Sequence, residues 1–255
     1  MNIGQALMLG IVQGLTEFLP VSSSGHLGLF QHWFNLQEPA LFFDVFLHAA
    51  SLLAIIIFFW PSIKTLKLND YWLLSIGTLP AVIVGLLSKN MVELILAIPF
   101  LIGFALLITG IINLLTNRLL HRSITQTKKL TTSKSLMIGV FQSLALIPGI
   151  SRSGTTLLGG LHQGLNKNQA FTFAFLLAVP AILGANASQI IQLFVEQQPI
   201  PTNQLLLAGG LGALVTSLFS LNILKKLIAQ ARFAFFGWYC LMLGSGIVLT
   251  QLMFN

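Results

Sequence analysis

One short polar stretch interrupts an otherwise apolar sequence and limits what this chain can fold into. It reads Gln13-Gly-Leu-Thr-Glu17-Phe-Leu-Pro20-Val-Ser22-Ser23-Ser24-Gly25-His26. An acid, an imidazole and three adjacent hydroxyls are costly in lipid unless they line a wet or protein-enclosed cavity. A second polar stretch, at residues 142–156, contains Pro148, Gly149 and an arginine, Arg152, between two serines. We expect the two stretches to meet in one site.

The composition excludes an ordinary soluble domain. Of the 255 residues, 55% are hydrophobic and only 7% are charged, whereas soluble chains carry about 25% charged residues. We therefore expect an all-α polytopic membrane protein. Its one cysteine, Cys240, excludes an intrachain disulfide and a cysteine-based metal site. The first residues lack a basic segment and a cleavage site, so we predict no removable signal peptide.

Each polar stretch separates two apolar runs that are too short to cross a bilayer, which takes about 20 residues. This pattern favours a re-entrant helical hairpin at each stretch. Three runs of spanning length follow each hairpin. They cover approximately 40–60, 71–87 and 93–116 in the first half, and 168–194, 204–224 and 233–254 in the second.

The two halves form an internal repeat with a constant offset of 129 residues, since Gln13 matches Gln142 and Ser22 matches Ser151. We predict one membrane domain over 1–255, with repeat 1 at 1–117, a basic cytoplasmic linker at 118–134 and repeat 2 at 135–255. Each half crosses the membrane three times, which is an odd number, so the second half starts on the opposite side. We therefore predict that the two halves are inverted relative to each other. Inverted repeats with broken helices place their site near the bilayer midplane.

The basic residues orient this topology. One side of the predicted membrane holds Lys64, Lys67, Arg118, Arg122, Lys128, Lys129, Lys134, Lys167, Lys225, Lys226 and Arg232. The other side holds Lys89, and Arg152 lies within the membrane. Cytoplasmic loops are rich in Lys and Arg, so the net charge of +7 is explained without a nucleic-acid partner. Both termini are then outside, the first hairpin enters from outside, and the second enters from the cytoplasm.

The two breaks have the chemistry of an anion site. Serines cap helix starts, and helix N-termini bind anions through free N–H groups. The planar guanidinium group of Arg152 is suited to bind two phosphate oxygens at once. The residues that we expect to bind substrate phosphate are Ser22, Ser24, Gly25, Ser151, Ser153, Gly154 and Thr155.

Glu17 indicates a cation beside that anion. A carboxylate repels phosphate unless a divalent ion bridges them, and Mg²⁺ takes one or two carboxylates together with phosphate oxygens. Gln13 lies four residues earlier, on the same helical face, so we predict Gln13 and Glu17 as the metal ligands. Asp44 and His48 have the same spacing. We expect them either to support this metal site or to form a structural pair.

His26 adds a group that transfers protons near neutral pH. We predict Glu17, Ser23, His26 and Arg152 as the catalytic residues, because phosphoryl transfer needs positioning and charge neutralisation. The attacking group is left open between Ser23, His26 and water. An isolated serine or threonine in a membrane helix usually bonds its own helix, so we assign no role to such residues elsewhere.

These motifs resemble the bacterial undecaprenyl-diphosphate phosphatase family, which is linked to bacitracin resistance. The resemblance rests on Gln13-x-x-x-Glu17 followed by Phe-Leu-Pro-Val-Ser-Ser-Ser-Gly-His26, and on Pro148-Gly-Ile-Ser-Arg-Ser-Gly-Thr-Thr156. It extends over essentially the whole chain. Many members have glutamate where Gln13 stands, so this chain has one charged ligand fewer.

The resemblance implies a multi-pass enzyme of the bacterial plasma membrane with a site facing outside. The reaction would convert undecaprenyl diphosphate into undecaprenyl phosphate and inorganic phosphate, which recycles the lipid carrier for cell-wall synthesis. It also implies dependence on Mg²⁺ or Ca²⁺, competition by bacitracin for the polyprenyl diphosphate substrate, and a homodimer.

Two other functions fit the same pocket. The chain could be a carrier or flippase for undecaprenyl phosphate, because inverted repeats with broken helices are typical of transporters. It could also be a non-catalytic lipid-phosphate binder. Glu17 and His26 favour the enzyme, since neither alternative needs a metal ligand beside a proton-transfer group.

Overall fold

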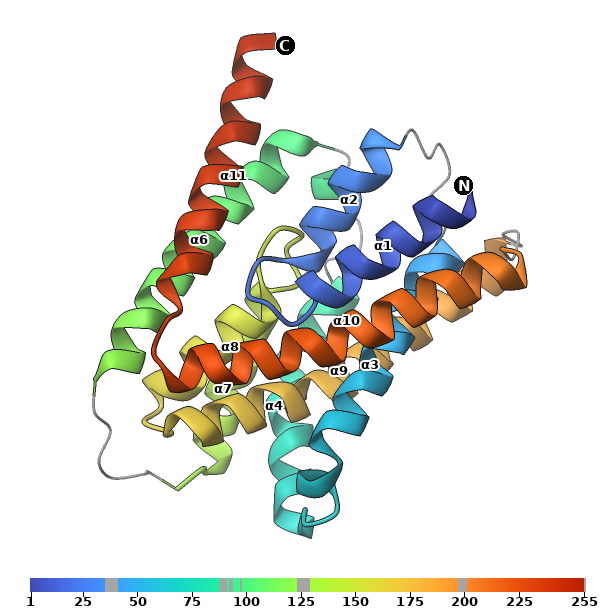
Figure 1. Ribbon diagram of the computed structural model, residues 1–255. Coiled ribbons are helices and arrows are strands. Elements are labelled where there is room, and N and C mark those ends of the chain that lie inside the picture. The colour runs from blue at the N-terminus through green and yellow to red at the C-terminus, as the bar shows by residue number, and fades with distance from the viewer. Residues whose placement is uncertain are drawn as a thin grey trace.

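The protein is a bundle of α-helices in the computed structural model, which describes residues 1–34, 41–87, 91, 94–96, 98–122, 129–196 and 201–254 (Figure 1). The helices are α1 (Ile3–Thr16), α2 (Ser23–Trp33), α3 (Leu41–Ile63), α4 (Leu68–Leu87), α6 (Pro99–His121), α7 (Thr132–Leu144), α8 (Arg152–His162), α9 (Lys167–Glu196), α10 (Asn203–Ala229) and α11 (Ala234–Phe254).

Six of these helices, α3, α4, α6, α9, α10 and α11, are long and apolar enough to cross a membrane. The predicted class, an all-α polytopic membrane protein, is therefore confirmed. The third span is α6, which begins at Pro99, and proline suits the first turn of a helix; its predicted start near residue 93 lies outside the described residues. Helix α6 continues to His121 and α7 begins at Thr132, so both ends of the predicted linker 118–134 are helical.

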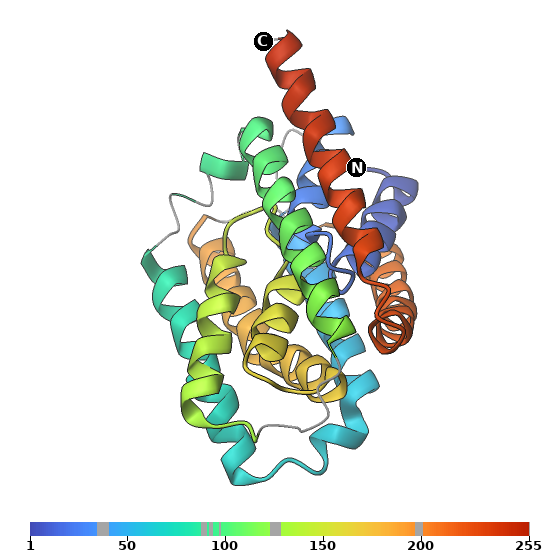
Figure 2. The ribbon, with the colours of Figure 1, turned by 90° about the vertical axis from the view of Figure 1, so that its left-hand side faces the viewer.

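The two short hairpins each pack against a helix from the other half of the chain. Helix α1 lies along α10, and α7 lies along α4 (Figures 1 and 2). Both contacts bring backbone against backbone. A Cβ atom on Gly10 would overlap the carbonyl group of Gly209, and one on Gly139 would overlap that of Gly77. Gly10 and Gly139 are 129 residues apart, so the same close crossing occurs in both halves.

A buried aromatic cluster fixes the first break to the core. Phe18, which follows Glu17, is fully buried, and its ring forms a T-shaped pair with that of Phe175, with centroids 5.7 Å apart. Phe175 stacks in turn on Phe59 of α3 at 5.8 Å. The backbone beside Glu17 is thus held by α9 and α3, and this places the carboxylate inside the bundle.

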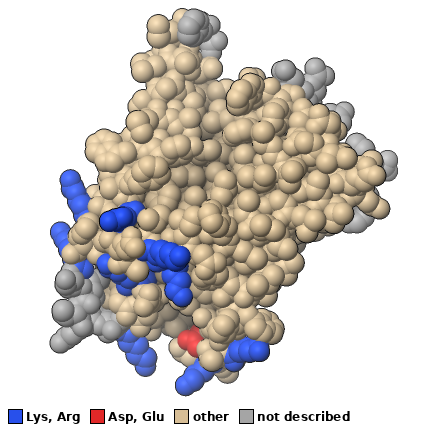
Figure 3. All heavy atoms as spheres, viewed as in Figure 1, with Lys and Arg blue, Asp and Glu red and all other residues tan. Residues whose placement is uncertain are grey.

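The basic side chains gather at one end of the molecule. On the face seen in Figure 3, the visible Lys and Arg lie around the ends of α3, α6 and α10 and the starts of α4, α7 and α9. Lys89 and Lys128 are outside the described residues. Helix α7 starts and α8 ends at this basic end, whereas α1 starts and α2 ends near the opposite end (Figures 1 and 2).

The glycine crossings make a prediction about stability. We expect Gly10→Ala and Gly139→Ala each to lower the melting temperature in detergent by several degrees, because the neighbour is backbone and overpacking costs about 1–3 kcal/mol. Gly184→Ala in α9 is the matched control, since a Cβ there meets nothing within 4 Å. Equal melting temperatures for all three variants would contradict these crossings.

Candidate active site

The two polar breaks meet at one pocket of about 200 Å³. Among the residues predicted for the site, those that line it are Glu17, Ser22, Ser23, Ser24, His48, Ser151 and Arg152. The Nη2 atom of Arg152 donates a hydrogen bond to Oε1 of Glu17, which joins the second break to the first. The sequence-based expectation that these breaks come together is met.

Glu17 is the centre of this pocket. Glu17 is only 7% exposed. Its Oε2 accepts hydrogen bonds from the Ser23 hydroxyl at 2.6 Å and from Nε2 of Gln13 at 3.1 Å. Nε2 of His48 lies 3.7 Å from the same oxygen. The buried carboxylate is therefore surrounded by donors on both oxygens, with Arg152 as the countercharge.

The starts of α2 and α8 are built in the same way. Ser22 Oγ accepts a bond from the backbone N–H of Gly25 at 3.4 Å, and Ser151 Oγ accepts one from Gly154 at 3.3 Å. These serines line the pocket, so both helix N-termini begin at its wall. Gly25, Ser153, Gly154 and Thr155 are buried in the first turns behind that wall. The Thr155 hydroxyl bonds carbonyls of its own helix start.

Two polar residues of α6 hold the breaks, and our sequence analysis assigned neither of them. The Asn113 amide donates to the carbonyl of Pro20 at 2.5 Å. The Thr109 hydroxyl donates to the carbonyl of Gly149 at 2.8 Å and accepts from the backbone N–H of Ser151 at 3.0 Å. Both side chains are fully buried. Their four-residue spacing along an apolar span was the available signal.

Both ring nitrogens of His26 form hydrogen bonds, and neither bond is to Ser23. Nδ1 bonds the carbonyl oxygen of Ser22 at 2.8 Å, and Nε2 bonds the Tyr239 hydroxyl at 2.7 Å. A carbonyl only accepts, so Nδ1 donates and Nε2 of the neutral ring accepts from Tyr239. Ser22 has a positive φ of 70°, a strained conformation that His26 thus helps to hold. Tyr239 was not predicted as a site residue.

Asp44 and His48 have different surroundings. Both carboxylate oxygens of Asp44 accept from Nε2 of Gln31, at 2.8 and 2.9 Å. The backbone carbonyl of Asp44 accepts from Nδ1 of His48 at 2.8 Å, which turns Nε2 of His48 toward Glu17. His48 thus reaches the pocket, while the Asp44 side chain forms a structural pair with α2.

Two residues, Gln13 and Glu17, have side-chain oxygens suited to a divalent cation. Oε1 of Gln13 is a buried oxygen without a hydrogen-bond partner in the described part of the chain. Oxygen and nitrogen of an amide exchange by a half-turn, which would direct this oxygen to the carboxylate of Glu17. The described residues hold no cluster of three or more His, Cys, Asp or Glu side chains, so the remaining ligands would be substrate oxygens and water.

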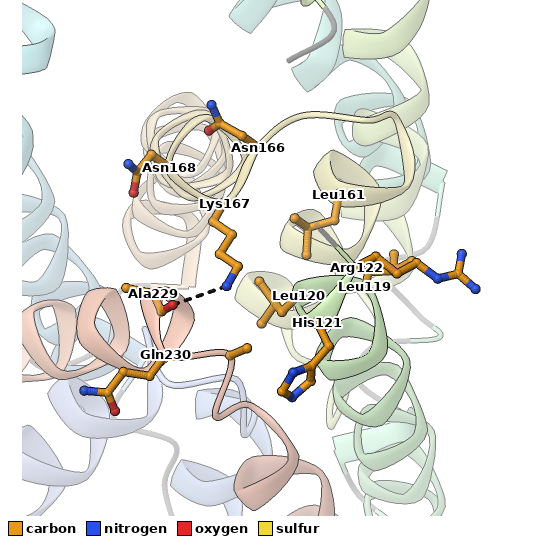
Figure 4. Close-up of a pocket in the computed structure, with 11 residues that line it drawn as sticks. Leu119, Leu120, His121, Arg122, Leu161, Asn166, Lys167, Asn168, Ala229 and Gln230 are labelled. Atoms are coloured by element: carbon orange, nitrogen blue, oxygen red, sulfur yellow. Dashed lines mark hydrogen bonds between the residues drawn. The ribbon is translucent and has the colours of Figure 1, made fainter. Parts of the chain in front are cut away.

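A larger cavity of about 540 Å³ lies at the basic end, between the ends of α6, α8 and α10 (Figure 4). None of the predicted site residues lines it. Nζ of Lys167 is bonded to the carbonyl of Ala229 at 3.2 Å, and Arg122 points away from the cavity. The smaller pocket at Glu17 is therefore the candidate active site.

Comparison with known proteins agrees with the two motifs. Residues 6–246 match the family model described as bacitracin resistance protein BacA. Undecaprenyl-diphosphatase of Rhodopirellula baltica is 38% identical, over 97% of this chain and 98% of the relative. The proteins of the same name from Thermosipho africanus and Methanococcus maripaludis strain C5 are 39% and 37% identical, over 93% and 92% of this chain and 96% and 95% of theirs. The chain belongs to the bacitracin resistance protein BacA family.

Proposed function

We propose that this protein hydrolyses undecaprenyl diphosphate to undecaprenyl phosphate and inorganic phosphate, and so recycles the lipid carrier for cell-wall synthesis. One observation carries the proposal. The Ser23 hydroxyl bonds the Glu17 carboxylate, which is paired with Arg152 from the other break. A hydroxyl activated by a carboxylate beside an arginine is suited to phosphoryl transfer, and the relatives named above are called undecaprenyl-diphosphatase.

The proposed membrane arrangement is an inverted repeat in the bacterial plasma membrane. Each half contributes one re-entrant hairpin and three spans, and both termini lie outside. Three observations support it: the matched crossings at Gly10 and Gly139, the basic end, and the opposite directions of the two hairpins. Positive residues favour the cytoplasmic side, so the basic end is inside.

The pocket is proposed to face outward and to admit the lipid from the side. Its apolar wall includes Ala81 of α4 and Ala185 of α9. Both lie in the halves of these helices that are farthest from the basic end. A polar end with Glu17 and Arg152 next to an apolar wall suits a diphosphate on a prenyl chain.

Arg152 and the helix starts would bind the diphosphate. Among the described residues, Arg152 bonds protein only through Nη2, and a guanidinium carries five N–H donors, so donors are left for phosphate oxygens. Ser22, Ser24 and Ser151 present hydroxyls to the same space. The N-termini of α2 and α8 add their positive dipole ends.

Ser23 is the proposed nucleophile. Its oxygen would attack the terminal phosphorus while Glu17 takes the proton, and the bond to the bridging oxygen would break with release of undecaprenyl phosphate. Water would then cleave the phosphoserine to inorganic phosphate and restore Ser23. The alternative is direct attack by a water in the same position. His26 acts by holding the Ser22 turn, since both ring nitrogens are engaged.

Mg²⁺ or Ca²⁺ would be held by Glu17 and by the amide oxygen of Gln13. The bound ion would neutralise the charge of the phosphate oxygens. Nε2 of His48 lies 3.7 Å from Oε2 of the same carboxylate. Bacitracin would compete by binding the substrate, and a homodimer is a further expectation of the family resemblance.

A carrier for undecaprenyl phosphate is less favoured. A carrier needs the arginine and the helix starts, but it has no use for a serine bonded to a buried carboxylate. The Ser23–Glu17 contact therefore favours the enzyme over the carrier and over a non-catalytic binder.

Phosphate release tests the proposal. Purified protein in detergent should release one inorganic phosphate for each undecaprenyl diphosphate, EDTA should stop the release, and added Mg²⁺ or Ca²⁺ should restore it. A parallel preparation of Arg152→Ala controls for contaminating phosphatases. No release with either metal would overturn the proposed function.

Tyr239 gives a second prediction. Tyr239→Phe keeps the ring that stacks on His26 at 5.7 Å but removes the hydroxyl that holds Nε2. We expect kcat to fall about fivefold with little change in KM, because one buried hydrogen bond is worth about 1 kcal/mol. Tyr71→Phe, at an exposed position, is the control. An unchanged kcat in Tyr239→Phe would remove the His26–Tyr239 pair from the mechanism.

A further inference from the structure

The side chain of Gln142 is buried without a partner. The residue is only 2% exposed, yet neither Nε2 nor Oε1 has a hydrogen-bond partner among the described residues. Buried polar atoms in proteins nearly always have partners, and leaving one unsatisfied is costly. An amide with two unsatisfied atoms therefore indicates that something other than the protein completes it.

Gln142 lies in the last turn of α7 and lines the same pocket as Glu17 and Arg152. It is the repeat counterpart of Gln13, 129 residues earlier. The amide of Gln13 bonds Glu17, whereas the position matching Glu17 in the second half is Leu146. The second half thus has the amide, but an apolar side chain stands at the position of the carboxylate partner.

The surroundings of Gln142 favour an anionic ligand. The second break contributes the Arg152 guanidinium and the Ser151 hydroxyl to the pocket, and Glu17 is the one acid among the described lining residues. The charge of Glu17 is balanced by its ion pair with Arg152. An amide N–H₂ offers two donors, and phosphate oxygens are strong acceptors.

We propose that Gln142 is a substrate-binding residue whose Nε2 donates to a phosphate oxygen of the bound diphosphate, beside Arg152. The assignment rests on the proposed function for its substrate. Phosphate oxygens would then supply the partners that the described part of the protein does not give this amide.

A ligand-binding amide and a structural amide respond differently to substitution. Gln142→Met has a similar length but no polar atoms, so it relieves the unpaired amide. We expect the melting temperature to stay equal or to rise, while kcat/KM for undecaprenyl diphosphate falls 10- to 100-fold, about the worth of a hydrogen bond to a charged group. Gln230→Met, at an exposed helix end, is the matched control and should change neither quantity.

Binding is measured separately from turnover. The probe is a prenyl methylenediphosphonate, in which CH₂ replaces the bridging oxygen, and the readout is the rise in melting temperature of the full-length protein in detergent. Wild type and Gln230→Met should be stabilised by the probe, and Gln142→Met much less. Gln142→Glu should lose still more stabilisation, because it places a negative charge against phosphate.

The results distinguish a failure of the Gln142 assignment from a failure of the proposed function. Unchanged kcat/KM and probe stabilisation in Gln142→Met would overturn the assignment while leaving the proposed function standing. A large loss of melting temperature in both Gln142→Met and Gln142→Leu would make the amide structural and would also overturn it. If Gln142→Glu keeps the kcat/KM of the wild type, the amide N–H₂ is not the group that binds the phosphate, and the assignment is overturned. Probe stabilisation that depends on Gln142, without turnover by wild type, would overturn the proposed function alone.

Discussion

The ion pair between Glu17 and Arg152 is the contact on which this architecture depends. The Glu17 carboxylate is buried and the Arg152 side chain is only 18% exposed, inside a bundle of apolar helices where desolvation of an ion costs several kcal/mol. Such a pair is tolerated only when further hydrogen bonds complete it, and Ser23 and Gln13 provide them here. Because one partner follows α1 and the other begins α8, the pair brings together chain segments 135 residues apart.

A second constraint is the backbone of the two breaks. Non-helical backbone inside a membrane protein must have its N–H and C=O groups satisfied by protein or by water in a cavity. Thr109 and Asn113 meet this need from the middle of α6, and Ser22 and Ser151 meet it at the helix starts. The same bonds fix the hydroxyls around the pocket before substrate arrives, which is the preorganisation that phosphoryl transfer requires. The contacts that satisfy the backbone of the two breaks therefore also hold the hydroxyls of the pocket in place.

Sequence patterns predicted the long-range plan but not its local partners. Apolar runs, their breaks and the repeat predicted six spans, two hairpins and the meeting of Glu17 with Arg152. The patterns did not pair Ser23 with Glu17 or His26 with Tyr239, since these bonds depend on side-chain directions within the folded bundle. Thr109 and Asn113 resembled ordinary polar residues of a membrane helix. Gln142 was recognised only as a repeat match, because its lack of a partner is visible only in three dimensions.

The most direct measurement is a double-mutant cycle on this ion pair, followed by melting temperature in detergent without substrate. Arg152→Gln should lower the melting temperature strongly, because it leaves the buried Glu17 carboxylate without its countercharge, at a cost of about 3–5 kcal/mol, and Glu17→Gln should lower it less, because Arg152 is partly exposed. The double variant carries neither charge and should melt above both single variants. If the two losses simply add, the carboxylate and the guanidinium do not form one pair, and the single shared site is contradicted.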